Sequence, residues 1–402
     1  MAPLLSAHQR RFVDRLYHEI RARGCAPERI LAPFQEIPRH WFVAQLCPWD
    51  ARSHSMLGCP LDVRPDTEDG ALLDRVYADA ALCIQVRRDC STSSSSQPSL
   101  MAQMMAEIGL APGMHVLEIG TATGWNAALM GQVVGPRGRV VSIEYDRDLA
   151  DAARARLACY GLDANVTVLC GDGVAGVPAE APFDAILATV ACPDVPRVWL
   201  SELAEGGCLL LPYELPTSAA PLLRLRRSGE RWTGAFGGWT WFVALRGGGL
   251  EPWPEPLEVG RDPRLAALLD ETPVAVPLPR SGLGWDGPQS ENLALYLLAA
   301  VPGAGWLHVP DGPHGAGGLH CGLATSRTGD PSLAVVLDST LAGFGAPSAR
   351  ERLAAGIAAW QAAGQPRIGD YQVAAQTATT AQGELVLRRP QTALVLTCGC
   401  PR

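Results

Sequence analysis

The sequence lacks an excess of positive charge, a long apolar segment and a targeting segment at its start. Asp and Glu (41) outnumber Lys and Arg (33), and the formal net charge of −8 argues against a nucleic-acid partner, which would need a basic surface. No apolar run reaches the roughly 18 residues that cross a bilayer, so we expect no membrane partner. His8, Arg10 and Arg11 stand where a signal peptide would have its apolar core. We therefore expect a cytoplasmic protein; no feature of the sequence fixes its oligomeric state.

Metal-binding modules with a familiar spacing are also lacking. Two groups contain residue types that bind metals, His308 with His314, His320 and Cys321, and Cys398 with Cys400. Neither group has the spacing of a known zinc module. The adjacent His320 and Cys321 would also point to opposite faces of a strand. We therefore predict no metal site.

Predicted strands and helices alternate between residues 115 and 211. The strands are expected at 115–119, 139–144, 165–169, 184–189 and 207–211, and the helices at 124–134, 147–160 and 196–204. This alternation predicts an α/β fold, a Rossmann-like parallel sheet wrapped by helices. Ligands of such sheets bind outside the carboxyl ends of the strands.

The 402 residues exceed what one core usually contains, so two domains are expected. We predict an N-terminal helical and loop cap region at 1–90, a core at 91–246, a Gly- and Pro-rich linker at 247–256 and an α+β domain at 257–402. Within the cap, 37–43 should be a loop closing into an apolar strand. Residues 221–227 and 239–245 should form a hairpin at the end of the core. The last domain contains no motif with a recognisable chemistry.

The most informative stretch is residues 116–124, V-L-E-I-G-T-A-T-G, which is followed by a second apolar strand ending at Glu144. Glycines after a strand let the backbone approach a nucleotide, and a carboxylate at the next strand end binds ribose hydroxyls. Gly120 and Gly124 do not form G-x-G-x-x-G, which disfavours a dinucleotide. The looser turn, preceded by Glu118, suits S-adenosylmethionine, a compact nucleoside with a cationic tail. An ordinary strand-to-helix turn is the alternative.

Several motifs in a fixed order resemble the protein-L-isoaspartate O-methyltransferase family. They are Pro38-Arg39-His40-x-Phe42-Val43, Ser96-Gln97-Pro98, the strand and turn at 116–120, Gly171-Asp172-Gly173 with Gly176, 181–184, Gly206-Gly207 and Phe242-Val243. The resemblance covers about residues 6–246. It implies a class I S-adenosylmethionine-dependent methyltransferase that esterifies a carboxylate of an aspartyl or isoaspartyl residue in a peptide or protein.

The resemblance also implies a cofactor site. Glu144 would bind the ribose hydroxyls, and Asp172 with Gly173 would face the adenine amino group. The methionine end of the cofactor would lie against Gly120, Thr121 and Gly124. Glu118 would contact the cofactor's amino group; its alternative role is to cap the N-terminus of the following helix.

A serine-rich segment, Ser93 to Ser96, is similar to the loop that holds the acceptor carboxylate in this family. The resemblance gives the acceptor role to Ser96, with Ser94 and Ser95 as helpers; the alternative is a flexible linker. A carboxylate is ionised at neutral pH, so the reaction needs alignment of the reacting atoms rather than a general base. This agrees with the lack of a recognisable catalytic pair.

Three features depart from the repair enzymes of the family: the C-terminal extension, Trp125-Asn126 and the longer serine run. They resemble relatives that methylate a genuine aspartate in ribosomally made precursors of lanthipeptides, lasso peptides or graspetides, where the ester cyclises to an aspartimide. We therefore expect an enzyme of peptide maturation, with the last domain recognising the precursor. The alternatives are an isoaspartyl repair methyltransferase and a small-molecule methyltransferase.

Overall fold

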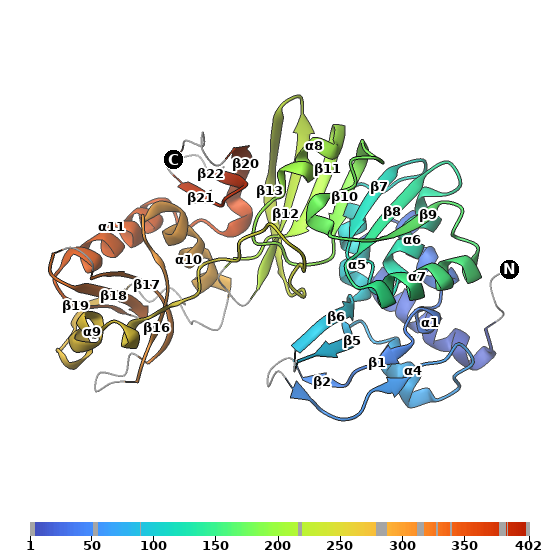
Figure 1. Cartoon of the computed structure of the whole chain (residues 1–402), viewed down its shortest axis with the longest axis horizontal. Coiled ribbons are helices and arrows are strands. Elements are labelled where there is room, and N and C mark those ends of the chain that lie inside the picture. Colours follow the sequence, from blue (N-terminus) through green and yellow to red (C-terminus); the bar gives the residue numbers. More distant parts are fainter. Residues whose placement is uncertain are drawn as a thin grey trace. The chain divides into compact units, whose positions relative to one another are not determined.

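The computed structural model describes residues 5–50, 55–88, 90–215, 219–278, 288–311, 317–326, 329–337, 340–377, 383 and 385–398. Contacts divide the chain into two compact units (Figure 1). Unit 1 comprises Met1–Tyr213, Ala220–Thr233 and Trp239–Leu250, and unit 2 comprises Glu214–Ala219, Gly234–Gly238 and Glu251–Arg402. The longest part of unit 2 thus starts inside the linker predicted at 247–256, and the predicted domain limits stay predictions.

The N-terminal part of unit 1 is a cap of short elements. Ser6 begins its first helix, α1, by accepting a hydrogen bond from the Gln9 amide in a capping box, and α1 buries Val13, Leu16 and Ile20. The cap contains α1 (Ala7–Ala22), α2 (Glu28–Leu31), α3 (Pro33–Glu36), η1 (Arg39–Trp41), α4 (Gly70–Val76) and the pairs β1 (Gln45–Leu46) with β4 (Leu61–Asp62), β2 (Trp49–Asp50) with β3 (Ser55–Met56), and β5 (Leu82–Arg87) with β6 (Cys90–Ser95).

Two predictions for unit 1 were wrong. Residues 37–43 do not close into a strand, because Arg39–Trp41 form a 3-10 turn that starts after Pro38. Most of the serine-rich segment is not a loop, because Cys90–Ser95 pair with β5 in an antiparallel hairpin and only Ser96 follows the strand. Serine has no strong strand preference, so the pairing with β5 had no signal in the run itself.

A mainly parallel sheet forms the centre of unit 1. Its strand order is β13-β12-β11-β10-β7-β8-β9. Strands β11, β10, β7, β8 and β9 are parallel to one another, and β12 is antiparallel to β11. The elements are α5 (Pro98–Glu107), β7 (His115–Ile119), α6 (Trp125–Val134), β8 (Arg139–Glu144), α7 (Arg147–Tyr160), β9 (Val166–Cys170), η2 (Gly173–Ala175), β10 (Phe183–Ala188), α8 (Arg197–Glu202), β11 (Leu203–Pro212), β12 (Ala220–Ser228) and β13 (Arg231–Thr240). The predicted Rossmann-like α/β core is therefore confirmed.

The hairpin at the end of the core was placed partly wrongly. Its second strand, β13, covers Arg231–Thr240 rather than 239–245. Three of its residues are Gly234, Gly237 and Gly238, and glycine is disfavoured in strands. Residues 231–238 show no clear alternation of apolar and polar residues, so the strand was predicted instead at the apolar residues that follow.

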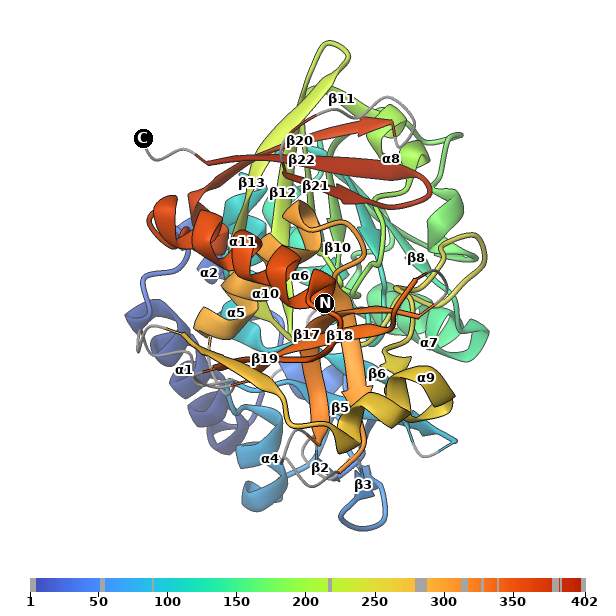
Figure 2. The same cartoon turned by 90° about the vertical axis from the view of Figure 1, so that its left-hand side faces the viewer.

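Unit 2 contains a six-stranded sheet with a core on each face (Figure 2). Its order is β14-β16-β17-β18-β19-β15, and α11 packs on β17, β18 and β19. A second group of strands, β21-β22-β20, lies beside α10. The elements are β14 (Leu257–Glu258), η3 (Val259–Arg261), α9 (Pro263–Ala266), η4 (Ala267–Asp270), β15 (Val274–Pro277), α10 (Pro288–Ala300), β16 (Gly305–Val309), β17 (Gly318–Thr325), β18 (Ser332–Leu337), β19 (Thr340–Gly345), α11 (Ser348–Ala362), η5 (Ile368–Asp370), β20 (Tyr371–Thr377), β21 (Leu385–Arg388) and β22 (Thr392–Cys398).

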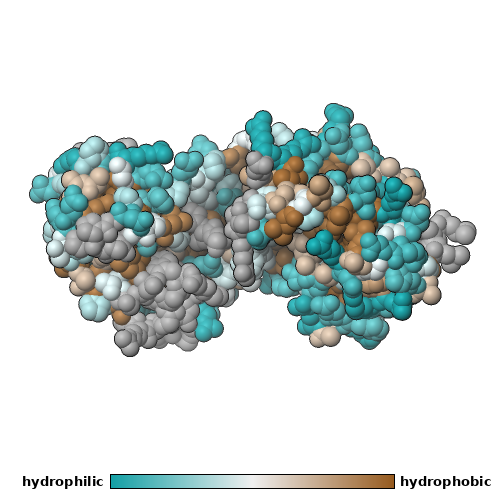
Figure 3. Space-filling view, turned by 90° about the horizontal axis from the view of Figure 1, so that it is seen from below, coloured by the Kyte–Doolittle hydropathy of each residue, from teal (hydrophilic) through white to brown (hydrophobic). Residues whose placement is uncertain are grey.

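None of the described helices is both long enough and apolar enough to cross a bilayer. Hydrophilic side chains cover much of the face of unit 1 shown in Figure 3, with apolar patches between them.

A fully buried arginine joins separate segments of unit 1. Arg39 is 0% exposed, and its guanidinium lies 5.2 Å from the ring centroid of Trp125 at the start of α6. The guanidinium donates hydrogen bonds to five main-chain carbonyls, those of Val76, Ala78, Ala80, Ser95 and Ser96, and to the Ser95 hydroxyl. One side chain therefore fixes the end of α4 and the end of β6 against the core.

Replacing this arginine should strongly destabilise unit 1. Arg39→Met keeps a similar volume but leaves five main-chain carbonyls without their donor, which should lower the free energy of unfolding by about 3 kcal/mol or more. The matched control is Arg29→Met, which removes one bond to the Leu110 carbonyl and should cost about 1 kcal/mol or less. Urea unfolding of both variants measures the difference, and equal costs would contradict the joining role of Arg39.

Candidate active site

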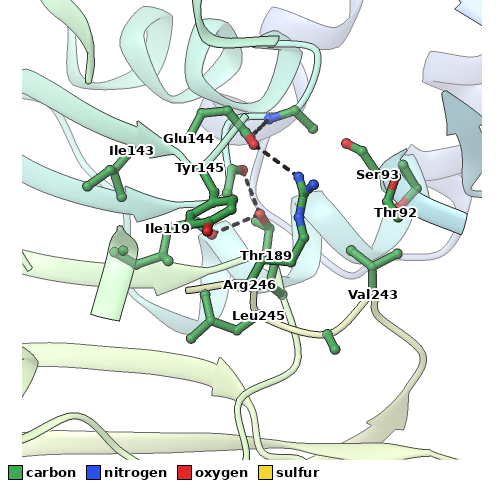
Figure 4. Close-up of a pocket in the computed structure, with 16 residues that line it drawn as sticks. Thr92, Ser93, Ile119, Ile143, Glu144, Tyr145, Thr189, Val243, Leu245 and Arg246 are labelled. Atoms are coloured by element: carbon green, nitrogen blue, oxygen red, sulfur yellow. Dashed lines mark hydrogen bonds and ion pairs between the residues drawn. The ribbon is translucent and has the colours of Figure 1, made fainter. Parts of the chain in front are cut away.

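A cleft opens at the carboxyl ends of β7, β8 and β10, where the sequence predicted a ligand site (Figure 4). Its lining residues are 92–94, 119–120, 122, 143–145, 173, 189–190 and 243–246. They come from the serine strand β6, from the ends of or segments after four neighbouring strands, β7, β8, β9 and β10, and from a segment after β13. The cleft thus brings the predicted cofactor turn and part of the serine run to one place.

The glycine turn gives the cleft its floor. Gly120 has a φ of +101°, and a Cβ there would lie 2.8 Å from the Thr189 hydroxyl, so only glycine fits without a shift. The Thr189 hydroxyl donates to the carbonyl of Gly120 over 2.8 Å. Gly124 begins α6 with a φ of +82° and faces Ala153 of α7. Of these two glycines, Gly120 lines the cleft and Gly124 supports it from behind.

Glu144 is the acid of the cleft. It is 4% exposed, and its carboxylate accepts hydrogen bonds from the amides of Ala122 (2.8 Å) and Asp146 (3.0 Å). These bonds fix the carboxylate at the end of β8, facing the cleft (Figure 4). Two oxygens held in this way can accept the pair of hydroxyl groups of a ribose.

The segment 243–246 forms a wall that sequence reasoning missed. Two main-chain hydrogen bonds hold it to the loop after β10. The Ala191 amide donates to the Val243 carbonyl over 2.9 Å, and the Leu245 amide donates to the Ala191 carbonyl over 2.8 Å. Its last residue, Arg246, lies 3.5 Å from Glu144 and 4.0 Å from Asp146. Phe242-Val243 was recognised as a family motif, but no signal in the sequence places Arg246 beside an acid one hundred residues earlier.

Glu118 lies behind the cleft rather than in its wall. It is 0% exposed and accepts hydrogen bonds from Ser142 and from Asn126, the latter over 2.6 Å. Thr121, 2% exposed, shares a hydrogen bond of 2.6 Å with the same Ser142 hydroxyl. Burial raises the pKa of Glu118 to about 7, against the lowering effect of Ser142 and Asn126. The contacts of Glu118 are to side chains, so they show neither of the two roles weighed for it.

Asp172 lies at the start of η2 and holds two backbone amides. It accepts from Val174 (2.9 Å) and from Gly248 (2.8 Å), just beyond the segment 243–246. Gly173 lines the cleft, and a Cβ there would come within 2.6 Å of Ile119. Gly173 is therefore placed at the cleft, whereas Asp172 anchors the chain beside it.

The serines of β6 have different surroundings. Ser94 lines the cleft and also an adjoining cavity, which Ser96 lines as well. Ser95 is 4% exposed and its hydroxyl accepts from Arg39, so it faces away from both. The segment is anchored further by Asp79, whose carboxylate accepts from the Ser99 amide (2.8 Å) and from Gln97 (3.2 Å).

The adjoining cavity has an aromatic rim that the sequence did not indicate. Trp239, Trp241 and Phe242 line it together with Ser94 and Ser96. Trp241 is 72% exposed, which is unusual for so large an apolar side chain. Exposed aromatic groups beside a cleft are typical of surfaces that bind another molecule.

Those candidate metal ligands that the structure describes do not form a metal-binding group. Within the described ranges, no group of three or more His, Cys, Asp or Glu side chains could hold a metal ion. His308 lies 3.1 Å from Glu258, and Cys321 is buried. His314 and Cys400 lie outside the described residues.

Comparisons with known proteins agree with this geometry. A family model described as "Protein-L-isoaspartate(D-aspartate) O-methyltransferase (PCMT)" matches residues 66–247. The protein-L-isoaspartate O-methyltransferase of Thermotoga maritima is 37% identical over 205 residues, which are 51% of this chain and 56% of that protein. The enzyme of the same name from Herpetosiphon aurantiacus is 32% identical over 261 residues, 65% of this chain and 100% of its own length.

A solved structure named protein-L-isoaspartate O-methyltransferase aligns with nearly the whole chain. It has a TM-score of 0.56 and 26% identity, and the alignment covers 96% of this chain and 100% of that one. The fold is therefore that of a class I S-adenosylmethionine-dependent methyltransferase with an additional C-terminal part, as predicted. The alignment also extends through unit 2, so this architecture is shared.

The buried carboxyl of Glu118 should make stability depend on pH. Its pKa of about 7 lies above the ordinary 4.5, so the folded state holds the proton more tightly than the unfolded chain. The free energy of unfolding should therefore fall as the pH rises from about 4.5 to about 7, by up to about 1.4 kcal/mol per pH unit.

Glu118→Gln removes this titration while keeping the shape of the side chain. Urea unfolding of both proteins at a series of pH values between about 5 and about 8 compares their slopes. The free energy of unfolding should fall less steeply with pH in the variant than in the natural chain. Burial also raises the pKa of Glu202 to about 7. Because Glu202 is present in both proteins, its contribution cancels when the two slopes are compared. Equal slopes would show that Glu118 is already ionised when folded.

Proposed function

Because the chain belongs to the protein-L-isoaspartate O-methyltransferase family, we propose that it transfers a methyl group from S-adenosylmethionine to the free carboxylate of an isoaspartyl residue in a polypeptide. One observation carries this proposal. A single cleft is lined both by the glycine turn with Glu144 and by Ser93 and Ser94 of the serine strand. A donor bound at the turn and an acceptor bound at the serines would therefore meet.

The cleft fits the cofactor in its chemistry. Glu144 offers carboxylate oxygens for the ribose, Ile119 and Ile143 offer apolar walls, and Tyr145 offers an exposed ring at the rim. Gly120 leaves room where a side chain would intrude. When bound, S-adenosylmethionine supplies a methyl group on a positively charged sulfur.

The residues of the chain have the task of alignment. The acceptor carboxylate is ionised at neutral pH, so no side chain needs to remove a proton from it. The hydroxyl of Ser96 or Ser94 would donate a hydrogen bond to one carboxylate oxygen and leave the other directed at the methyl group. The segment 243–246 would shield the reacting atoms from water.

The methyl ester prepares a second step within the substrate. The ester carbonyl is a better electrophile than the carboxylate, so the neighbouring amide nitrogen attacks it. A carbon–nitrogen bond forms, the ester carbon–oxygen bond breaks, and methanol leaves with the amide proton. The resulting succinimide can open in water to the ordinary aspartyl linkage, which is the logic of repair.

The second candidate is methylation of a genuine aspartate in a ribosomally made precursor, the function expected first from the sequence. One of its three supports, Trp125-Asn126, has a local structural explanation: Trp125 stacks on Arg39 and donates to the Ile37 carbonyl, and Asn126 donates to Glu118. Another, the C-terminal extension, also occurs in a structure named for isoaspartate. These points favour the isoaspartyl substrate.

Variants of the two halves of the cleft should have separate effects. Glu144→Ala should weaken S-adenosylmethionine binding by about 2–3 kcal/mol, because two charge-assisted hydrogen bonds are lost. Ser96→Ala should lower the methylation rate with little change in cofactor affinity, because it orients the acceptor. Ser94→Ala tests the serine that lines both the cleft and the adjoining cavity, and Ser95→Ala is the control outside both. Calorimetry and initial rates report both quantities; a joint loss in Ser96→Ala would place that serine in the cofactor site.

The substrate is tested with two peptides that differ only in the linkage of one residue. Mass spectrometry should show the gain of one methyl group on the isoaspartyl peptide, followed by loss of methanol. The aspartyl peptide of the same sequence should stay unmodified. Methylation of the aspartyl peptide alone would support the maturation candidate instead. Modification of neither peptide would contradict both.

A further inference from the structure

Three cavities of unit 1 meet at the serine strand. Ser94 lines the methyl-transfer cleft, the adjoining cavity and a second cavity, which encloses about 470 Å³. Val243 lines both the cleft and the second cavity. The second cavity therefore begins where an acceptor carboxylate would be held.

An aromatic ridge, Trp241 with Phe242, lines both the adjoining and the second cavity and so lies between them. Thr240 anchors one end of the ridge, because its buried hydroxyl donates to the Ala220 carbonyl over 2.7 Å. Phe242 anchors the other end by packing against the main core of unit 1. Trp241 stays exposed between these two anchors. The exposed indole is therefore attached to a fixed part of the main chain.

The second cavity has mostly apolar walls. Leu46, Pro48, Trp49 and Leu82 line it, and among its described lining residues only Arg75 carries a charge. Its volume is within the roughly 300–1,000 Å³ of pockets that hold small ligands, so one large side chain has room. Such walls favour an apolar side chain, which leaves water when it enters.

The adjoining cavity is more polar. Arg23, Gln97 and Gln103 line it, and Arg23 is paired with Asp79 over 2.7 Å. Its aromatic side is formed by Trp239 together with the ridge. The two cavities therefore differ in the side chains that they favour.

The position of the two cavities fits the two neighbours of a modified residue. An isoaspartyl residue inside a polypeptide has main chain on both sides of the carboxylate that accepts the methyl group. Consecutive Cα atoms are about 3.8 Å apart, and the isoaspartyl linkage adds one carbon to this path. Both neighbouring side chains would therefore start close to Ser94, within reach of the cavities that it lines.

We propose that the second cavity accepts an apolar side chain from a residue next to the isoaspartyl residue, and that Trp241 determines this preference. The inference rests on the proposed function, because it concerns the polypeptide acceptor of that reaction. The acceptor chain would cross the aromatic ridge, with one neighbour on each side of it. Apolar contact has no preferred direction, so several apolar side chains fit and the lesion can still be methylated in many sequences.

The test is a series of isoaspartyl peptides that differ only in the residue before or after the lesion: glycine, leucine, phenylalanine, glutamate or lysine. At one of the two positions, leucine or phenylalanine should raise kcat/KM about tenfold over glycine. The difference should lie mainly in KM, because the side chain binds away from the reacting atoms. Equal values at both positions would overturn the proposal. A higher value for glutamate would also overturn it, because the charge of Arg75 would then select the neighbour.

Two tryptophan variants test which cavity is used. Trp241→Ala should reduce the preference to less than about twofold, because the bound side chain loses contact with the ring. Since Trp241 is exposed, the melting temperature and the cofactor affinity should not change. Trp239→Ala is the matched control, because Trp239 lines only the adjoining cavity, and it should keep the preference. Loss of the preference in Trp239→Ala would place the apolar side chain in the adjoining cavity and overturn the assignment.

Binding measured without turnover keeps this proposal distinct from methyl transfer. Calorimetric titration of the full chain with the same peptides, without S-adenosylmethionine, reports affinity alone. If the leucine peptide binds more tightly than the glycine peptide but neither is methylated, the methyl-transfer proposal fails and the cavity assignment stands. If both are methylated with equal kcat/KM, the cavity assignment fails and methyl transfer stands. Neither binding nor methylation of any peptide would overturn both.

Discussion

The buried guanidinium of Arg39 is the contact on which the acceptor side of unit 1 depends. A charge without water must be surrounded by hydrogen-bond acceptors, and here these are main-chain carbonyls from two separate segments. Because main-chain atoms are the partners, the side chain fixes backbone positions rather than other side chains. The end of β6 is therefore located relative to Trp125 and the start of α6. Asp79 completes this by holding Gln97 and the first turn of α5.

The cleft itself is organised by two carboxyl groups at neighbouring strand ends. Glu144 faces the cleft, oriented by two amides and approached by Arg246. Glu118 lies behind the cleft, enclosed by Ser142 and Asn126. Strands β7 and β8 pair so that Glu118 lies opposite Ser142, and Glu144 extends two residues further. This offset places one acid at the cleft and keeps the other in the interior.

The sequence predicted the parts of this molecule that follow a periodic pattern. The alternating strands and helices of 115–211, the turn at Gly120 and the acid Glu144 were all placed from local residues. The strand β6 was missed because its partner β5, not its serines, makes it a strand. The roles of Arg39 and Arg246 were missed for a related reason. Each depends on contacts with segments far away in the sequence, and one sequence taken alone contains no signal for such contacts.

The pairing of β6 with β5 affects the entropy of substrate binding. A flexible serine loop would have to be ordered when a substrate arrives, and that ordering would cost about 1–2 kcal/mol for each residue fixed. In a paired strand the conformational entropy has already been lost during folding. The free energy of the contacts with the substrate is therefore not reduced by ordering of the strand. A short stretch of polypeptide around one damaged residue can then be enough. This would suit the proposed activity, in which the same lesion occurs in many unrelated sequences.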